Sequence, residues 1–95
     1  MNLEFGGEIW FWRGPSPFHF ITVPDEQSRE IEDESPSLTY GWGMIPVRAQ
    51  IGETEWTTSL IPKNQRYIVP VKVAVRRAEG LELGDVVTVR LTVGD

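Results

Sequence analysis

Hydrophobic and polar residues alternate along several short stretches of the chain, which is the pattern of half-buried β-strands. Clusters of Gly, Pro, Asn and Asp separate these stretches and favour turns, notably at residues 13–17 and 62–65. Pro46 lies inside one stretch and indicates a sheet edge or a bulge there, because proline cannot donate a ladder hydrogen bond. The pattern predicts strands at residues 3–12, 18–23, 44–51, 55–60, 67–69 and 86–93.

Two segments between the predicted strands have the features of helices. Pro24 can occupy a first helical position, and Asp25 and Glu26 then favour the positive end of the helix dipole. We expect this helix to end before residues 35–36, a Ser-Pro pair, and a second helix to span residues 70–79.

The chain also resembles itself when it is shifted by 46 residues. Scarce residue types then coincide in one register, which indicates that a unit of about 45 residues was duplicated. The predicted repeats are roughly residues 3–48 and 49–93. Near the end of each unit the shift falls to 42, so we interpret residues 33–36 as a surface loop inserted in the first unit. The matched pairs are Gly6 and Gly52, Trp10 and Trp56, Val23 and Val69, and Pro24 and Pro70.

Two units of strand, strand, helix and strand would close most simply into a barrel, because closure removes exposed sheet edges. The predicted fold is therefore mainly β: a six-stranded double-split β-barrel built from two β-β-α-β repeats, with two short helices, as a single domain over residues 1–95. Since both units are present in one chain, we expect a monomer.

The repeat also predicts which way the tryptophans point. Glu55 and Thr57 mark the wet face beside Trp56, so Trp56 should point inward and Trp10 should do the same. Ile9 and Phe11 would then need a cover, and the same alternation turns Glu8 inward, which is costly for a charged group.

Composition narrows the classes of function. The chain has 95 residues, no cysteine and one histidine, His19, so no disulfide framework, metal site or other cofactor is expected. No apolar run is long enough for a membrane span, and the first residues lack the features of a secretory signal. We therefore expect a cytoplasmic protein.

The net charge of −5 comes from one segment. Residues 25–34 contain six acidic residues and only one basic residue, Arg29, whereas the rest of the chain is neutral. A solvated helix face explains this segment most simply, and a basic partner or a cation is the alternative. A basic cluster in the second half is either an anion-binding patch or a solubilising surface. It consists of Lys63, Arg66, Lys72, Arg76 and Arg77.

Several strings, in this order and spacing, resemble the bacterial family known as domain of unknown function 1905. The resemblance implies a small split β-barrel, related in shape to the swapped-hairpin barrels of transition-state regulators and antitoxins. It carries over no catalytic residues. The strings are FGGEIW at residues 5–10, PFHF at 17–20, VP at 23–24, YGWGMIPV at 40–47, WTTSL at 56–60 and AEGLELGD at 78–85.

The candidate site comes from residues that the repeat does not explain. Trp12 is matched by the much smaller Thr58, so the scaffold does not require an indole there. Together with Tyr40 and Trp42, Trp12 can line an apolar recess in which Arg13 and His19 add polar contacts. Simple packing of these aromatic residues is the alternative.

Three functions follow from these residues. The leading hypothesis is a non-catalytic module that binds a small ligand or a peptide. The second is a nucleic-acid-binding regulator, which the negative net charge disfavours. The third is a hydrolase that uses His19. It is disfavoured because the chain has no Gly-x-Ser-x-Gly motif and no acid spaced to orient the histidine.

Overall fold

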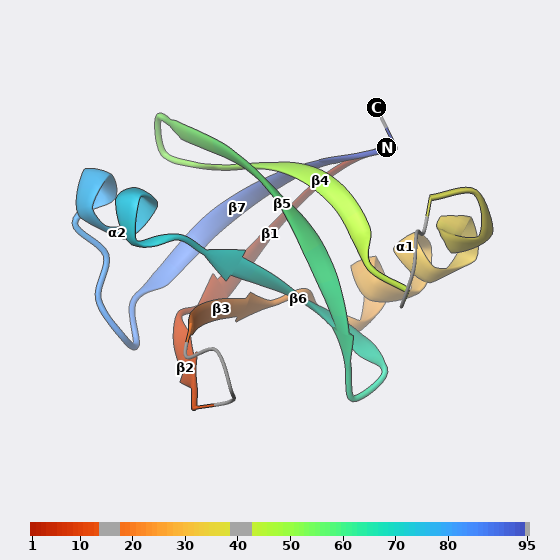
Figure 1. Cartoon of the computed structure of the whole chain (residues 1–95), viewed down its shortest axis with the longest axis horizontal. Helices are drawn as coiled ribbons and strands as arrows, with labels where there is room; N and C mark the ends of the chain where they lie inside the picture. Colours follow the sequence, from red (N-terminus) through yellow and green to blue (C-terminus); the bar gives the residue numbers. More distant parts are fainter. Residues whose placement is uncertain (14–17, 39–42, 95) are drawn as a thin grey trace.

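The structure is a computed structural model that describes residues 1–13, 18–38 and 43–94. The described chain contains seven strands and two helices (Figure 1). In chain order the elements are β1 (Asn2–Glu8), β2 (Trp10–Trp12), β3 (Phe18–Thr22), α1 (Asp25–Leu38), β4 (Ile45–Ile51), β5 (Thr54–Lys63), β6 (Arg66–Val71), α2 (Val73–Glu79) and β7 (Val86–Val93).

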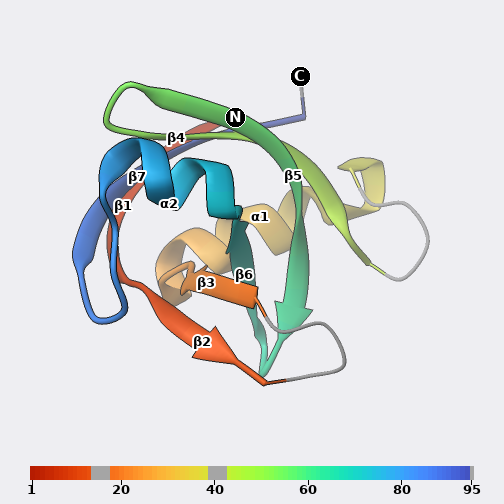
Figure 2. The same ribbon diagram turned by 60° about the vertical axis from the view of Figure 1, so that its left-hand side comes forward.

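All seven strands form one antiparallel sheet in the order β1-β7-β4-β5-β6-β3-β2. The sheet curls into a half-barrel, as Figures 1 and 2 show, so the mainly β class predicted from the sequence is confirmed. The curl brings β1 across to β3. A Cβ atom added at Gly7 would lie only 2.4 Å from Cγ2 of Ile21. Glycine is therefore required for this close approach of the two strands.

The sheet has seven strands rather than the predicted six because the predicted first strand, residues 3–12, is interrupted at Ile9. The Ile9 amide donates a hydrogen bond to the carbonyl of Asp85 at 2.9 Å, and the Ile9 carbonyl accepts one from the Gly84 amide at 2.9 Å. Before Ile9 the chain pairs with β7, and after it the chain pairs with β3. Ile9 thus connects the two end strands of the sheet, β1 and β2.

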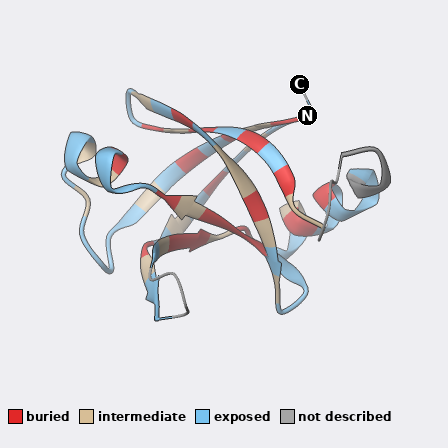
Figure 3. Ribbon diagram, in the orientation of Figure 1, coloured by how far each residue is buried: buried red, intermediate tan, exposed pale blue. Residues whose placement is uncertain are grey.

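The core lies on the concave side of the curl. Along β4 buried residues alternate with exposed or half-buried ones, and Figure 3 shows the same alternation in the ribbon. Ile31 of α1 and Val75 of α2 join this core, so each helix is anchored by a buried aliphatic side chain. Pro46 of β4 is exposed and precedes the residues paired with β7, where no backbone donor is needed on that side.

The predicted helix boundaries are partly wrong. Helix α1 starts at Asp25, one residue after the predicted first helical position, and continues to Leu38, so the segment interpreted as a loop insertion is helical. Proline removes one backbone donor without forbidding helical dihedral angles, and the helix passes through residue 36. Pro70 lies in β6 opposite Phe20, and α2 begins only at Val73. Within the described chain neither helix is long and apolar enough to cross a membrane.

The prediction that Trp10 and Trp56 are equivalent inward residues is wrong for Trp10. Trp56 is buried in the core, and its indole N–H donates to the carbonyl of Pro70 at 3.0 Å. Trp10 is half-buried and lies outside the core cluster, whereas its neighbour Ile9 is only 1% exposed. Glu8 is correspondingly exposed. The alternation along β1 places Ile9 inside, so Trp10, the next residue, projects away from the core.

Candidate functional site

The outer face of β2 and β3 carries a second group of aromatic side chains, separate from the core. Trp10 pairs with Phe20 and Trp12 with Phe18, and residues paired across two strands project to the same face. Phe20 is central and only 2% exposed; its ring centroid lies 5.4 Å from Trp10, 5.9 Å from Trp12 and 6.3 Å from Phe18. We call these four residues the aromatic strip. Trp12 and Phe18 remain 37% and 47% exposed, so the strip has a solvent-facing end.

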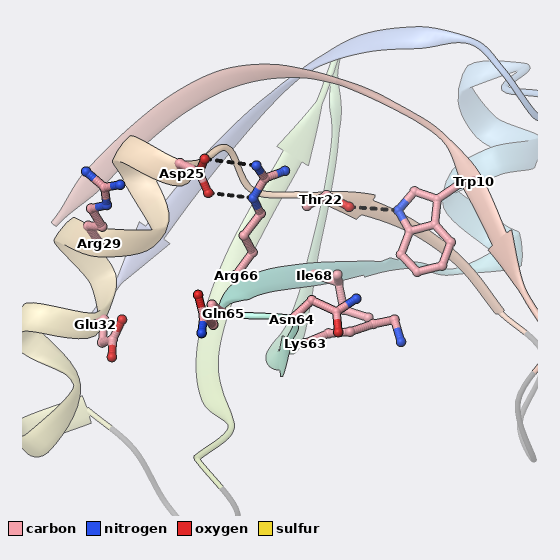
Figure 4. Close-up of a pocket in the computed structure, with 10 residues that line it drawn as sticks. All are labelled: Trp10, Thr22, Asp25, Arg29, Glu32, Lys63, Asn64, Gln65, Arg66 and Ile68. Carbon is pink, nitrogen blue, oxygen red and sulfur yellow. Dashed lines mark hydrogen bonds and ion pairs between the residues drawn. The ribbon is translucent and has the colours of Figure 1, made fainter.

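A cleft of about 940 Å³ lies between α1 and the β5–β6 hairpin, beside Trp10 of the aromatic strip. Figure 4 shows α1 on one side of this cleft and Trp10 on the other. We call it the α1–hairpin cleft. Its lining residues are Trp10, Thr22, Asp25, Arg29, Glu32, Lys63, Asn64, Gln65, Arg66 and Ile68.

Helix α1 presents one face to the cleft. Asp25, Arg29 and Glu32 are spaced four and three residues apart, so they share a side of the helix. Ser28 fixes the helix against β6: its hydroxyl donates to the carbonyl of Val23 at 3.0 Å and accepts from the Tyr67 amide at 3.3 Å. The charged face of the helix therefore has a defined position over the sheet.

The β5–β6 turn has a backbone geometry that its second residue, Gln65, does not favour. Asn64 and Gln65 both have positive φ angles, 52° and 65°, which is the geometry of a two-residue type I′ turn. Asparagine is common at the first of these positions, but the second strongly favours glycine. Gln65 thus carries an amide side chain into the cleft from a conformation that costs an L-residue roughly 1–2 kcal/mol.

An ion pair joins the two walls of the cleft. The Arg66 guanidinium donates to both carboxylate oxygens of Asp25, at 2.5 and 2.9 Å. Chiefly through these hydrogen bonds, Arg66 lowers the pKa of Asp25, and Asp25 raises the pKa of Arg66. Both side chains are about half exposed, so the pair positions the helix end relative to the hairpin rather than contributing strongly to stability.

Two further contacts link the cleft to the aromatic strip. The Trp10 indole N–H donates to the hydroxyl of Thr22 at 3.0 Å, which fixes the orientation of the ring. The Lys63 ammonium lies 4.3 Å from the ring centroid of Trp12 and makes a cation–π contact. Lys63 therefore belongs to the cleft and touches the strip.

The residues predicted from the sequence do not gather at one place. Trp12 belongs to the aromatic strip, and Arg13 is exposed just after β2. His19 faces the opposite side of the β2–β3 pair, where its ring lies 5.1 Å from that of Phe11. Burial, and then the positive charge of Arg76, lowers the pKa of His19. Tyr40 and Trp42 lie outside the described residues.

From the sequence alone, the residues that line the cleft could be recognised only as members of an acidic segment and a basic cluster. The acidic segment 25–34 supplies the helical wall, and Lys63 and Arg66 come from the predicted basic cluster. The other members of that cluster, Lys72, Arg76 and residue 77, lie in or next to α2, which Figures 1 and 2 place away from the β5–β6 turn. The basic cluster is thus divided between two parts of the surface.

The part of the chain described by the structure contains no group of three or more His, Cys, Asp or Glu side chains that could hold a metal ion. The model of the family described as domain of unknown function (DUF1905) matches residues 5–91. No curated protein matches the chain.

Proposed function

The chain belongs to this family, domain of unknown function 1905, and because the description names no activity we propose from the geometry that the protein is a non-catalytic binding module. Its site is the α1–hairpin cleft. The observation that carries the proposal is the position of this polar cleft directly beside partly exposed aromatic rings.

The size and lining of the cleft support small-molecule or short-peptide binding. Ligand sites in proteins commonly occupy about 300–1,000 Å³ and combine apolar surface with a few convergent polar groups. Here Trp10 provides the apolar surface, and charged and amide side chains line the rest of the cleft.

Several of these polar groups make no hydrogen bond within the protein. In the described part of the chain, the side chains of Glu32, Asn64 and Gln65 form no hydrogen bond or ion pair, and Arg29 interacts with Asp25 through its charge. Gln65 also occupies a strained turn position where glycine would be more favourable. A strained backbone at Gln65 lowers stability, so its presence beside the cleft supports a role of the Gln65 side chain in binding.

The alternatives find less support. The single histidine, His19, lies on the other face of the β2–β3 pair with its ring tilted against that of Phe11, which argues against a hydrolase centred on it. The basic residues are divided between the hairpin and α2, which argues against a continuous phosphate-binding surface for nucleic acid.

We infer as well that the fold arose by duplication of a β-β-α-β unit. Thr22 lies opposite Ile68, 46 residues later, and Ala49 lies opposite Leu91, 42 residues later. Both shifts are those of the sequence repeat, which supports a pseudo-two-fold axis through these pairs. Thr22 and Ile68 are equivalent positions of the two units, and both line the cleft. The helices of the two units differ in length, with 14 residues in α1 and 7 in α2, and the longer helix α1 forms one wall of the cleft.

The test is a fragment screen by NMR on protein labelled with ¹⁵N at its four tryptophans. Trp→Phe variants assign the four indole N–H signals. We expect binding fragments to shift the Trp10 signal while the signal of Trp56, buried in the core, stays in place. Arg29→Gln should weaken binding, whereas Arg77→Gln on the exposed side of α2 should not. A library of neutral, cationic and anionic fragments that leaves Trp10 unmoved would refute the proposal.

A further inference from the structure

The α1–hairpin cleft has a chemical preference that can be derived from its lining. We infer, resting on the proposed function, that its ligand is a planar aromatic ring that carries a negatively charged group. The ring would stack on Trp10, and the negative charge would lie between Lys63 and Arg29.

The argument for a planar ring starts from Trp10. Its only polar atom is already used, because the indole N–H donates to Thr22, so the side chain offers the cleft only apolar ring surface. Phe20 lies behind it at 5.4 Å and holds the indole in place. A rigid aromatic surface at the edge of a cleft favours another ring in offset or edge contact.

The argument for negative charge starts from the balance of charges in the cleft. Its lining contains three cationic and two anionic side chains, in a chain whose net charge is −5. Asp25 and Arg66 neutralise each other through their two hydrogen bonds, so Lys63 and Arg29, whose charge also acts on Asp25, remain against Glu32. The side chains that line the cleft thus carry one net positive charge on a negative molecule, which favours an anionic group among them.

The position of Lys63 makes a cationic ring a poor alternative. A cation could bind a tryptophan face, but the Lys63 ammonium already lies over Trp12 at 4.3 Å and would repel it. Figure 4 shows the Lys63 side chain on the Trp10 side of the cleft, with Arg29 and Glu32 on the helix opposite. An anion attached to a ring on Trp10 would therefore lie close to Lys63, while the amides of Asn64 and Gln65 can bond the polar edge of the ring.

Two kinds of ligand share this chemistry, an aromatic carboxylate and a nucleoside monophosphate. The experiment compares 2-naphthoate with neutral 2-naphthamide, and adenosine 5′-monophosphate with adenosine, by titration followed through NMR. The chain contains only two lysines, Lys63 and Lys72, so lysine labelled with ¹³C at Cε gives one signal from the cleft and one from outside it.

We expect at least one anionic probe to bind about 5- to 10-fold more tightly than its neutral partner, since hydrogen bonds to charged groups are stronger by about 1 kcal/mol. The anionic probe should shift the Lys63 signal and leave that of Lys72 unchanged. Lys63→Met should abolish the preference for the anion without weakening the neutral probe, and Lys72→Met should change neither affinity. Raising NaCl from about 50 to 500 mM should weaken only the anionic probe.

The outcomes separate this inference from the proposed function. Equal affinity for charged and neutral probes, or a preference that survives Lys63→Met, overturns the anionic class while binding at Trp10 stands. The anionic class is also overturned if other fragments bind at Trp10 but none of the four probes binds. The probe pair with the larger difference in affinity between its anionic and neutral members shows whether the cleft prefers a carboxylate or a phosphate. If Lys63→Met fails to fold, Arg29→Gln provides the same comparison, because Arg29 is exposed on α1.

Discussion

Replacement of Gln65 by glycine should stabilise the protein while weakening ligand binding. Gln65 is the second residue of the β5–β6 turn and has a φ angle of 65°. Glycine adopts this angle without steric cost, and the change creates the Asn-Gly pair that type I′ turns favour most. The perturbation removes only backbone strain and an exposed amide side chain.

The magnitude follows from two opposing terms. Relief of the left-handed conformation contributes roughly 1–2 kcal/mol, and the greater freedom of glycine in the unfolded chain costs about 0.5–1 kcal/mol. The free energy of unfolding should therefore rise by about 0.8 kcal/mol, the midpoint of a difference that runs from about 0 to 1.5 kcal/mol. For a domain of this size the midpoint corresponds to an increase in Tm of about 3–6 °C.

Urea unfolding at equilibrium measures the change, with the m-value checked for constancy. Gln27→Gly is the matched control, because Gln27 lies in α1 and the same substitution there should lower the free energy of unfolding by about 0.5–1 kcal/mol. If Gln65→Gly is no more stable than the natural protein, the argument that Gln65 is strained is refuted. If it is more stable and binds as tightly, the amide has no part in the site.

Three other predictions test the fold and its assembly. Gly7→Ala should lower the free energy of unfolding by about 1–3 kcal/mol, because the new methyl group would meet Ile21. Gly6→Ala is the control and should be tolerated, because the nearest atom to its new methyl group is 3.9 Å away. Thermal unfolding of both variants checks this difference. Arg66 lowers the pKa of Asp25 from 3.8, so the ion pair stabilises the protein above pH 3.8, and this contribution is lost as the pH falls through the lower pKa of the folded state. Asp25→Asn should therefore flatten the dependence of the free energy of unfolding on pH in that range, as measured with urea. If the variant keeps the same pH dependence, the Asp25–Arg66 pair does not make this contribution. Sedimentation of the isolated chain should give a monomer at micromolar concentration, and a concentration-dependent dimer would disprove it.

Much of the fold is determined locally and could be predicted from the sequence. Alternating residues define a strand within a few positions, so β3, β4 and β7 were expected close to where they lie. The turn at Asn64 was expected from residue type alone. Helix ends were less predictable, since Pro70 suits a helix start as well as a strand and its pairing with Phe20 decides between them.

The candidate site could be predicted only as separate pieces. Trp12 was singled out as a residue that the repeat does not explain, and the two charge clusters were noted, but nothing in the sequence places them together. Trp10 was assigned to the core because it matches Trp56 in the repeat register. Its actual orientation depends on Ile9, whose hydrogen bonds reach Asp85 at the far end of the chain.

The sequence by itself determined which segments are strands and helices and where charge and aromatic residues concentrate, because these properties depend on neighbours within a few positions. Tertiary structure alone decided that the acidic helix faces the basic hairpin. That arrangement follows from the pairing of β3 with β6 and from the hydrogen bond between the Val23 amide and the Tyr67 carbonyl, 44 residues apart. The cleft exists because strands distant in the chain share hydrogen bonds, and no local pattern encodes which strands will pair.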